Sequence, residues 1–152
     1  MAQAFGMEVV ALSRRPQAQL PQGVTKVDAP CFWSSCHVIT LHCPLTPDTH
    51  HLVNASTLSL MRPGTILINT GRGAIVDEQA VSQALHSGLL SAYAADVLST
   101  EPPQESNPLL SSPNVFLTPH IAWATREARM RLMRILEDNV RAFIQGTPIN
   151  TV

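Results

Sequence analysis

Residues 62–81 read RPGTILINTGRGAIVDEQAV, and this stretch decides the fold class. Its apolar part, TILIN at residues 65–69, is typical of a strand in a parallel sheet that is covered on both faces. The turn Gly71-Arg72-Gly73 follows directly, and Asp77 then provides an N-cap for a helix that runs to about Ser87. A strand, a glycine-rich turn and a capped helix in succession predict one unit of an α/β fold.

The same alternation extends in both directions along the chain. Short β-branched and apolar runs predict further strands, and apolar residues at helical spacing predict further helices. We expect strands over residues 7–12, 38–41, 92–97 and 115–117, and helices over residues 54–61 and 124–145. This order predicts an α/β fold with a Rossmann-like, doubly wound parallel sheet.

Composition and charge limit the function classes. The 152 residues include 10 basic and 11 acidic side chains, so no basic face is available for nucleic acid or an anionic membrane. No apolar run approaches the roughly 20 residues of a membrane span, and the N-terminus does not resemble a signal peptide. The three cysteines match no common zinc spacing and are expected to be reduced. We therefore expect a cytoplasmic protein without a metal site.

Polar side chains follow four of the predicted strands. A doubly wound sheet binds its ligands at the carboxyl ends of its strands. The residues at these positions are His42-Cys43-Pro44, Thr70 to Gly73, Asp96 with Glu101 in the next loop, and Thr118-Pro119-His120. Arginine, aspartate, glutamate and histidine thus all fall where such a fold places its active site.

Three of these side chains form a candidate catalytic set. The glycines beside Arg72 allow a sharp turn, and its guanidinium can hold a carboxylate through two hydrogen bonds. His120 can donate a proton when an acid raises its pKa, and Glu101 is the natural partner. From the residues alone, a surface arginine in a turn and a structural histidine in the core remain open alternatives.

Taken together, these motifs resemble the NAD(P)-dependent D-2-hydroxyacid dehydrogenases. The matching stretches, in family order, are AFGMEVVALSRR (4–15), LHCPLTPDTHHLVN (41–54), LMRPGTILINTGRGAIVDEQAV (60–81), DVLSTEPP (96–103) and LTPHIAW (117–123). They cover nearly the whole chain, and the combination is far more specific than any one motif. Within the family, HIAWATREARMRLM (120–133) is most similar to the glycerate dehydrogenases, also called hydroxypyruvate reductases.

The resemblance implies hydride transfer between NAD(P)H and a small 2-oxo or 2-hydroxy acid, with hydroxypyruvate/D-glycerate or glyoxylate/glycolate as the expected pairs. It implies that Arg72 binds the substrate carboxylate and 2-oxo group, that His120 is the acid-base catalyst, and that Glu101 holds and charges this histidine. Asp96 would face the nicotinamide carboxamide. The implied cofactor-binding residues are Ser13, Arg14, Cys43, Pro44, Thr70, Gly71, Arg72, Asp96, His120, Ala122 and Trp123.

Two features depart from the family pattern. The phosphate-binding loop Gly-x-Gly-x-x-Gly is missing. Gly71-Arg72-Gly73 begins like this loop, but residue 76, where the third glycine would stand, is valine. The ribose-reading residue lies about 20 positions after that loop, and here this position falls near Ser13, so the loop would precede Met1. We therefore expect an N-terminally truncated chain, without the first strand and the substrate domain, that is inactive by itself. Ser13-Arg14-Arg15 stand where NAD users carry an acid, which favours NADP slightly.

The expected domains are a partial NAD(P)-binding domain over residues 1–123 and a helix with its tail over residues 124–152. This second segment would return toward the absent substrate domain, and the parent protein is expected to be a homodimer. Two rival functions remain open: a dinucleotide-sensing protein of the corepressor type, and an idle truncated product with inherited motifs. The joint presence of Arg72, Glu101 and His120 weighs against a sensor, which needs no proton donor.

Overall fold

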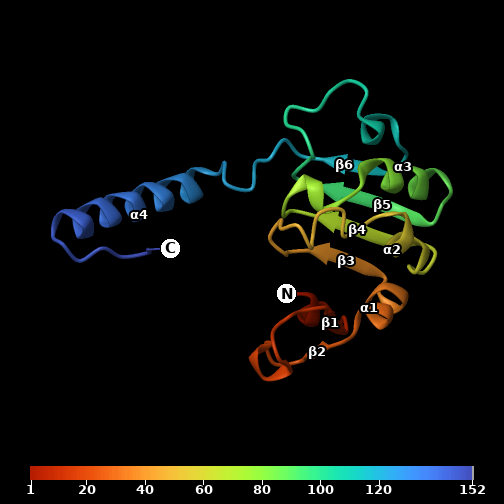
Figure 1. Cartoon of the computed structure of the whole chain (residues 1–152), viewed down its shortest axis with the longest axis horizontal. Helices are drawn as coiled ribbons and strands as arrows, with labels where there is room; N and C mark the ends of the chain where they lie inside the picture. The colour runs from red at the N-terminus through yellow and green to blue at the C-terminus, as the bar shows by residue number, and fades with distance from the viewer. Residues whose placement is uncertain (152) are drawn as a thin grey trace. The chain divides into compact units, whose positions relative to one another are not determined.

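Two parallel β-sheets organise residues 1–117 (Figure 1). The smaller sheet pairs β1 (Val9–Ala11) with β2 (Val24–Lys26). The larger sheet has the order β3-β4-β5-β6, and these strands are Val38–Leu41, Thr65–Asn69, Leu90–Ala95 and Val115–Leu117. The pairings within both sheets are parallel, which confirms the predicted α/β class with a Rossmann-like parallel sheet.

The computed structural model describes residues 1–151, and the chain divides into two units. Unit 1, residues 1–117, contains both sheets. Unit 2 begins at Thr118 and contains the long helix α4 (Arg126–Ile144). The two units are described separately.

Short helices connect the strands of unit 1. The α-helices among its described residues are α1 (Ala29–Ser35), α2 (Ala55–Ser59) and α3 (Glu78–His86). Short 3-10 helices occupy Ala2–Phe5, Gln17–Gln19, Gly73–Ile75 and Pro108–Ser111.

Both predicted helix caps in unit 1 are confirmed. Asn54 forms a capping box with Thr57 at the start of α2. Asp77 Oδ1 accepts hydrogen bonds from the backbone N–H groups of Gln79 and Ala80 at the start of α3. These local bonds fix where each helix begins, and therefore how long the preceding turn can be.

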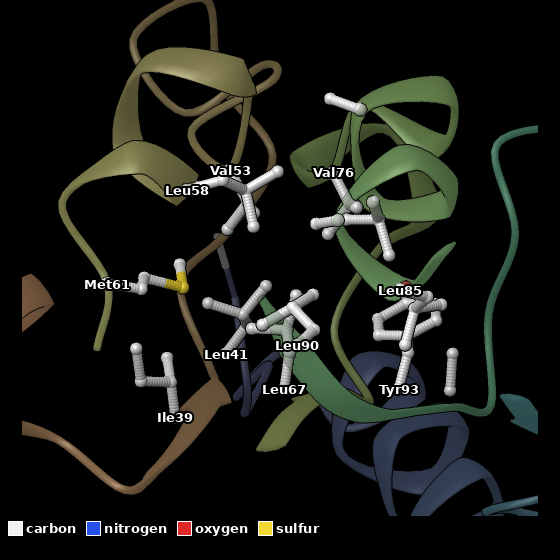
Figure 2. Close-up of a cluster of buried hydrophobic side chains, with 14 of the residues drawn as sticks. Ile39, Leu41, Val53, Leu58, Met61, Leu67, Val76, Leu85, Leu90 and Tyr93 are labelled. Atoms are coloured by element: carbon white, nitrogen blue, oxygen red, sulfur yellow. The ribbon is translucent and has the colours of Figure 1, made fainter. Parts of the chain in front are cut away.

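The core lies on one face of the larger sheet, between its strands and the helices α2 and α3 (Figure 2). Alternation along the strands directs Ile39, Leu67 and Tyr93 into this core, where each is at most 1% exposed. Leu58 of α2 and Leu85 of α3 complete it. This packing anchors the strands whose ends carry the candidate site.

The opposite face of the same sheet is open in unit 1. Ile66 of β4 is 36% exposed and Phe116 of β6 is 65% exposed. The apolar run at residues 65–69 predicts cover on both faces, whereas unit 1 covers only the face that bears Leu67. A strand this apolar needs a second layer, and residues 1–117 do not supply one.

The observed strands agree with most of the predicted ones. The predicted bounds of β3, β4 and β6 are confirmed. β5 spans residues 90–95 and not the predicted 92–97, and β1 spans 9–11 and not the predicted 7–12. The sequence interpretation missed β2 and α1. β2 has only three residues, two of them exposed, and α1 is a seven-residue helix with Pro30 in its first turn, so neither has a clear period.

Unit 2 consists mainly of the amphipathic helix α4, which confirms the predicted helix near residues 124–145. Thr125 Oγ1 accepts from the N–H of Ala128 and caps the helix. Its apolar residues Leu136, Val140 and Phe143 are exposed. No helix within residues 1–151 is both long enough and apolar enough to cross a membrane.

Candidate functional site

The strands of the larger sheet end in a single row. The register pairs Leu41 with Asn69, Asn69 with Ala95, and Ala95 with Leu117, which are the last residues of the four strands. Because the strands are parallel, the residues that follow them leave the sheet at the same edge. The structure therefore gathers the predicted functional segments of unit 1 at one edge, as the motif spacing predicts.

The turn that carries Arg72 is built around Asn69. This side chain is fully buried, and its Oδ1 accepts from the Gly71 N–H at 3.0 Å while its Nδ2 donates to the Arg72 carbonyl oxygen at 2.9 Å. The Arg72 Nη1 donates to the Gly71 carbonyl oxygen at 2.8 Å, and the side chain is exposed. The backbone is thus fixed from inside while the guanidinium stays available at the edge.

Asn69 has a second partner in the core, the phenol of Tyr93. Burial raises the pKa of Tyr93 far above its ordinary value, and the negative charge of Glu78 raises it further, whereas the hydrogen bond with Asn69 acts in the opposite direction. Tyr93 therefore stays neutral at ordinary pH. The sequence interpretation missed Asn69, although a polar residue ending an apolar strand is a usable signal for an anchored turn.

The Asp96 and Glu101 segment leaves the sheet beside this turn. Asp96 is 8% exposed, and its N–H donates to the Asn69 carbonyl oxygen at 3.1 Å. In the following loop the N–H of Leu98 donates to Glu101 Oε1 at 3.0 Å. The backbone of Leu98 lies directly against Gly73, since a Cβ at Gly73 would overlap it. The segments of Arg72 and Glu101 therefore meet in unit 1.

His120, Ala122 and Trp123 belong to unit 2. His120 is half-buried and adopts a positive φ of 51°, and its N–H donates to the Thr118 carbonyl oxygen at 3.0 Å. Trp123 is 57% exposed. Along the chain, His120 follows the end of β6 by three residues. The roles of these three residues remain predictions.

A cavity of about 850 Å³ lies between the smaller sheet and β3. Four predicted cofactor-binding residues line it, Ser13 and Arg14 after β1 and Cys43 and Pro44 after β3. Its size is within the usual range of ligand sites, roughly 300–1,000 Å³. Among the described strands none pairs with both β1 and β3, so the cavity separates two strand edges. Thr70, Gly71, Arg72 and Asp96 lie outside its lining.

The sequence family described as D-isomer specific 2-hydroxyacid dehydrogenase, NAD binding domain, matches residues 1–122. The chain is 41% identical to a hydroxypyruvate reductase of Blautia hydrogenotrophica over 153 residues, which cover 100% of this chain and 48% of that protein. It is 44% identical to a glycerate dehydrogenase of Methylorubrum extorquens, with 99% of this chain and 47% of that protein covered.

A solved structure supports the same relationship. The acyclic imino acid reductase Bsp5 in complex with NADPH and D-Arg is similar with a TM-score of 0.88 and 33% identity, covering 99% of this chain and 48% of that one. The chain thus spans about half the length of the relatives and the solved structure that it matches.

Proposed function

Because the chain belongs to the D-isomer specific 2-hydroxyacid dehydrogenase family, of which it matches the NAD-binding domain, we propose that it is the larger part of the cofactor domain of a longer oxidoreductase. The proposed reaction transfers a hydride between NAD(P)H and a small 2-oxo acid. Hydroxypyruvate and glyoxylate are the proposed substrates, since relatives named for these acids are similar over almost the whole chain. The observation that carries the proposal is the row of strand ends, which collects Arg72, Asp96 and Glu101 at one edge.

Arg72 binds the substrate in this proposal. Its guanidinium is exposed at the sheet edge, while the backbone on both sides is fixed by Asn69. A planar guanidinium can bind a carboxylate through two parallel hydrogen bonds, which orients a 2-oxo acid better than a lysine would. The flanking glycines leave room for the ligand to approach the backbone.

Glu101 and His120 perform the proton transfer in this proposal. His120 donates a proton to the carbonyl oxygen of the 2-oxo acid as that oxygen becomes a hydroxyl group. Glu101 stabilises the imidazolium form and fixes the ring tautomer. The hydride is supplied by the reduced nicotinamide when the cofactor is bound. One proton and one hydride together convert the 2-oxo acid into the 2-hydroxy acid.

The residues present fit part of the cofactor. The cavity between β1 and β3 has the size of a ligand site, and Ser13 and Arg14 in its lining offer a hydroxyl and a cation to a ribose or its 2′-phosphate. No Gly-x-Gly-x-x-Gly sequence occurs in the chain to cradle the pyrophosphate. We therefore propose that these 152 residues are inactive by themselves, that the longer protein prefers NADP slightly, and that it is a homodimer.

Steady-state kinetics of the full-length protein test the function. Reduction of hydroxypyruvate or glyoxylate by NADPH or NADH is expected, and loss of turnover is expected in His120→Asn. A dinucleotide sensor would show no turnover in the wild type, and its response to the cofactor would survive His120→Asn. Tighter binding of NADH than of NADPH would contradict the cofactor preference, and turnover by the isolated 152 residues would contradict their inactivity.

A further inference from the structure

Glu78, the first residue of α3, makes three hydrogen bonds to the loop that follows β5. Its Oε1 accepts from the N–H of Ser99 at 2.8 Å, and its Oε2 accepts from Ser99 Oγ at 2.7 Å and from Asn107 Nδ2 at 2.9 Å. These partners lie 21 and 29 positions away in the sequence. An acid in the first helical turn is favourable by itself, but that effect needs no such long-range partners. The side chain therefore joins the start of α3 to a distant loop.

The same loop carries Glu101, and the two carboxylates hold neighbouring peptide groups. The N–H of Leu98 donates to Glu101 Oε1 at 3.0 Å, and the next N–H, that of Ser99, donates to Glu78 Oε1. Hydrogen bonds to an ionised acceptor are shorter and about twice as strong as neutral ones. Glu78 thus fixes the peptide group that directly follows the one bonded to Glu101.

The turn that carries Arg72 touches this peptide as well. A Cβ placed on Gly73 would overlap the carbonyl group of Leu98 and the nitrogen of Ser99. The absence of a side chain at Gly73 therefore allows the turn to lie directly on the Leu98–Ser99 peptide. The Leu98–Ser99 peptide group is consequently in contact with the Arg72 turn and with Glu78, and the adjacent Val97–Leu98 peptide group bonds Glu101 through the Leu98 N–H.

We propose that Glu78 is a positioning residue, which sets the place of Glu101 relative to Arg72 by clamping the Leu98–Ser99 peptide between them. This inference rests on the proposed function, in which Arg72 holds the substrate and Glu101 charges His120. Glu78 reaches neither substrate nor cofactor in this role and acts through the loop backbone. In the proposed function Glu101 assists the proton transfer by His120, so a displaced Glu101 would support that step less well.

The test compares the full-length wild type with Glu78→Gln in the reduction of hydroxypyruvate, with kcat and KM measured across pH. The amide keeps one acceptor oxygen but removes the charge and presents a donor toward Asn107 Nδ2. We expect kcat to fall roughly 10- to 100-fold, as for a misplaced catalytic group, with little change in KM. Displacement of Glu101 from the reacting groups is also expected to change the alkaline limb of the kcat profile, a readout that a merely structural role of Glu78 would not move.

Glu105→Gln is the matched control, since Glu105 is an exposed carboxylate of the same loop and makes none of the clamp's hydrogen bonds. We expect it to leave kcat and the pH limb unchanged. If Glu78→Gln does not fold, Glu78→Asp retains the helix-terminal charge, withdraws the carboxylate from Ser99, and should shift kcat and the limb in the same direction.

Two negative results are distinguishable. An inactive wild type overturns the proposed function itself. An active wild type whose folded Glu78 variants keep kcat and the pH limb overturns only the positioning role, as does a variant that loses thermal stability without any shift of the limb.

Discussion

The side chain of Asn69 is hydrogen-bonded to the backbone of Arg72, with its Nδ2 donating to the Arg72 carbonyl oxygen at 2.9 Å. A residue with no exposed surface thus determines the backbone of a residue whose side chain is exposed. The buried amide of Asn69 and the proposed substrate-binding residue Arg72 are therefore directly linked. The position of the Arg72 backbone, from which the guanidinium extends, is therefore set by a side chain in the core.

Asn69→Asp tests this relationship, because it replaces the donor by an oxygen that faces a carbonyl oxygen. One oxygen of the buried carboxylate would then face the Arg72 carbonyl oxygen, and the free energy of unfolding is expected to fall by roughly 3 kcal/mol. Denaturant unfolding of the 152-residue chain measures this loss. Asn54→Asp is the control, since an aspartate remains a good cap for α2, and a change below about 0.5 kcal/mol is expected there. Equal losses at both positions would contradict the proposed anchoring.

Gly73→Ala tests the contact between the Arg72 turn and the loop of Glu101. The added methyl group would overlap the Leu98–Ser99 backbone, so one of the two segments must move. We expect a loss of about 1–3 kcal/mol in stability, as for an overpacked site. Gly71→Ala provides the comparison for stability alone, because its Cβ would meet its nearest neighbours at 3.4–3.5 Å, an ordinary contact. A stable Gly73→Ala protein would mean that this contact is not tight.

Arg72→Lys in the full-length protein tests the proposed bidentate binding of the substrate carboxylate. The charge remains but the planar pair of donors is lost, so kcat/KM for hydroxypyruvate should fall roughly 10- to 100-fold, equivalent to about 1.4–2.8 kcal/mol. Arg62→Lys is the matched control. Arg62 is exposed, its Nη1 bonds His37 Nε2 at 2.6 Å, and it precedes β4, at the end of the strand opposite to the proposed site. An unchanged kcat/KM in Arg72→Lys would contradict bidentate binding.

Alkaline pH should destabilise the fold through Tyr93. Burial holds the pKa of this phenol far above its ordinary value, so above pH about 10 the unfolded chain releases a proton that the folded chain keeps. The stabilisation is therefore complete below pH 10 and is lost as the pH rises further. Tyr93 is the only tyrosine of the chain, so phenolate absorbance follows it alone and should stay low until unfolding begins. In Tyr93→Phe the fall in unfolding free energy between pH 9 and 11 should be smaller; an equal fall would assign it to other groups.

The strands of the larger sheet were accessible to sequence reasoning because most of their residues are apolar or β-branched and clear turn signals flank them. β3, β4 and β6 have the predicted bounds for this reason. β2 and α1 lack such runs, since two of the three residues of β2 (Val24–Lys26) are the polar Thr25 and Lys26, and α1 has a proline in its first turn. Their placement depends on pairing with β1 and on the burial of Trp33, which no local pattern reveals.

The candidate site likewise contains residues that the sequence predicts and residues that it does not. Arg72, Asp96 and Glu101 each follow a strand, so the sequence predicts their edge once the strands are known. Asn69 was missed although a polar residue at the end of an apolar strand is a usable signal, and Glu78 was missed because its partners become visible only in the fold. Glu78 in particular bonds residues that lie 21 and 29 positions away, a distance that helical or strand periodicity does not bridge.

The row formed by Leu41, Asn69, Ala95 and Leu117 also governs where the chain tolerates changes in length. Turns on the amino-terminal side of the strands, such as those at Gly64 and Gly88, can gain residues without displacing the row. Inside a strand, a single deletion moves everything beyond it by about 3.3 Å and reverses which face each side chain meets. Length variation among descendants of this sequence should therefore accumulate at one end of the sheet and be nearly absent from its interior.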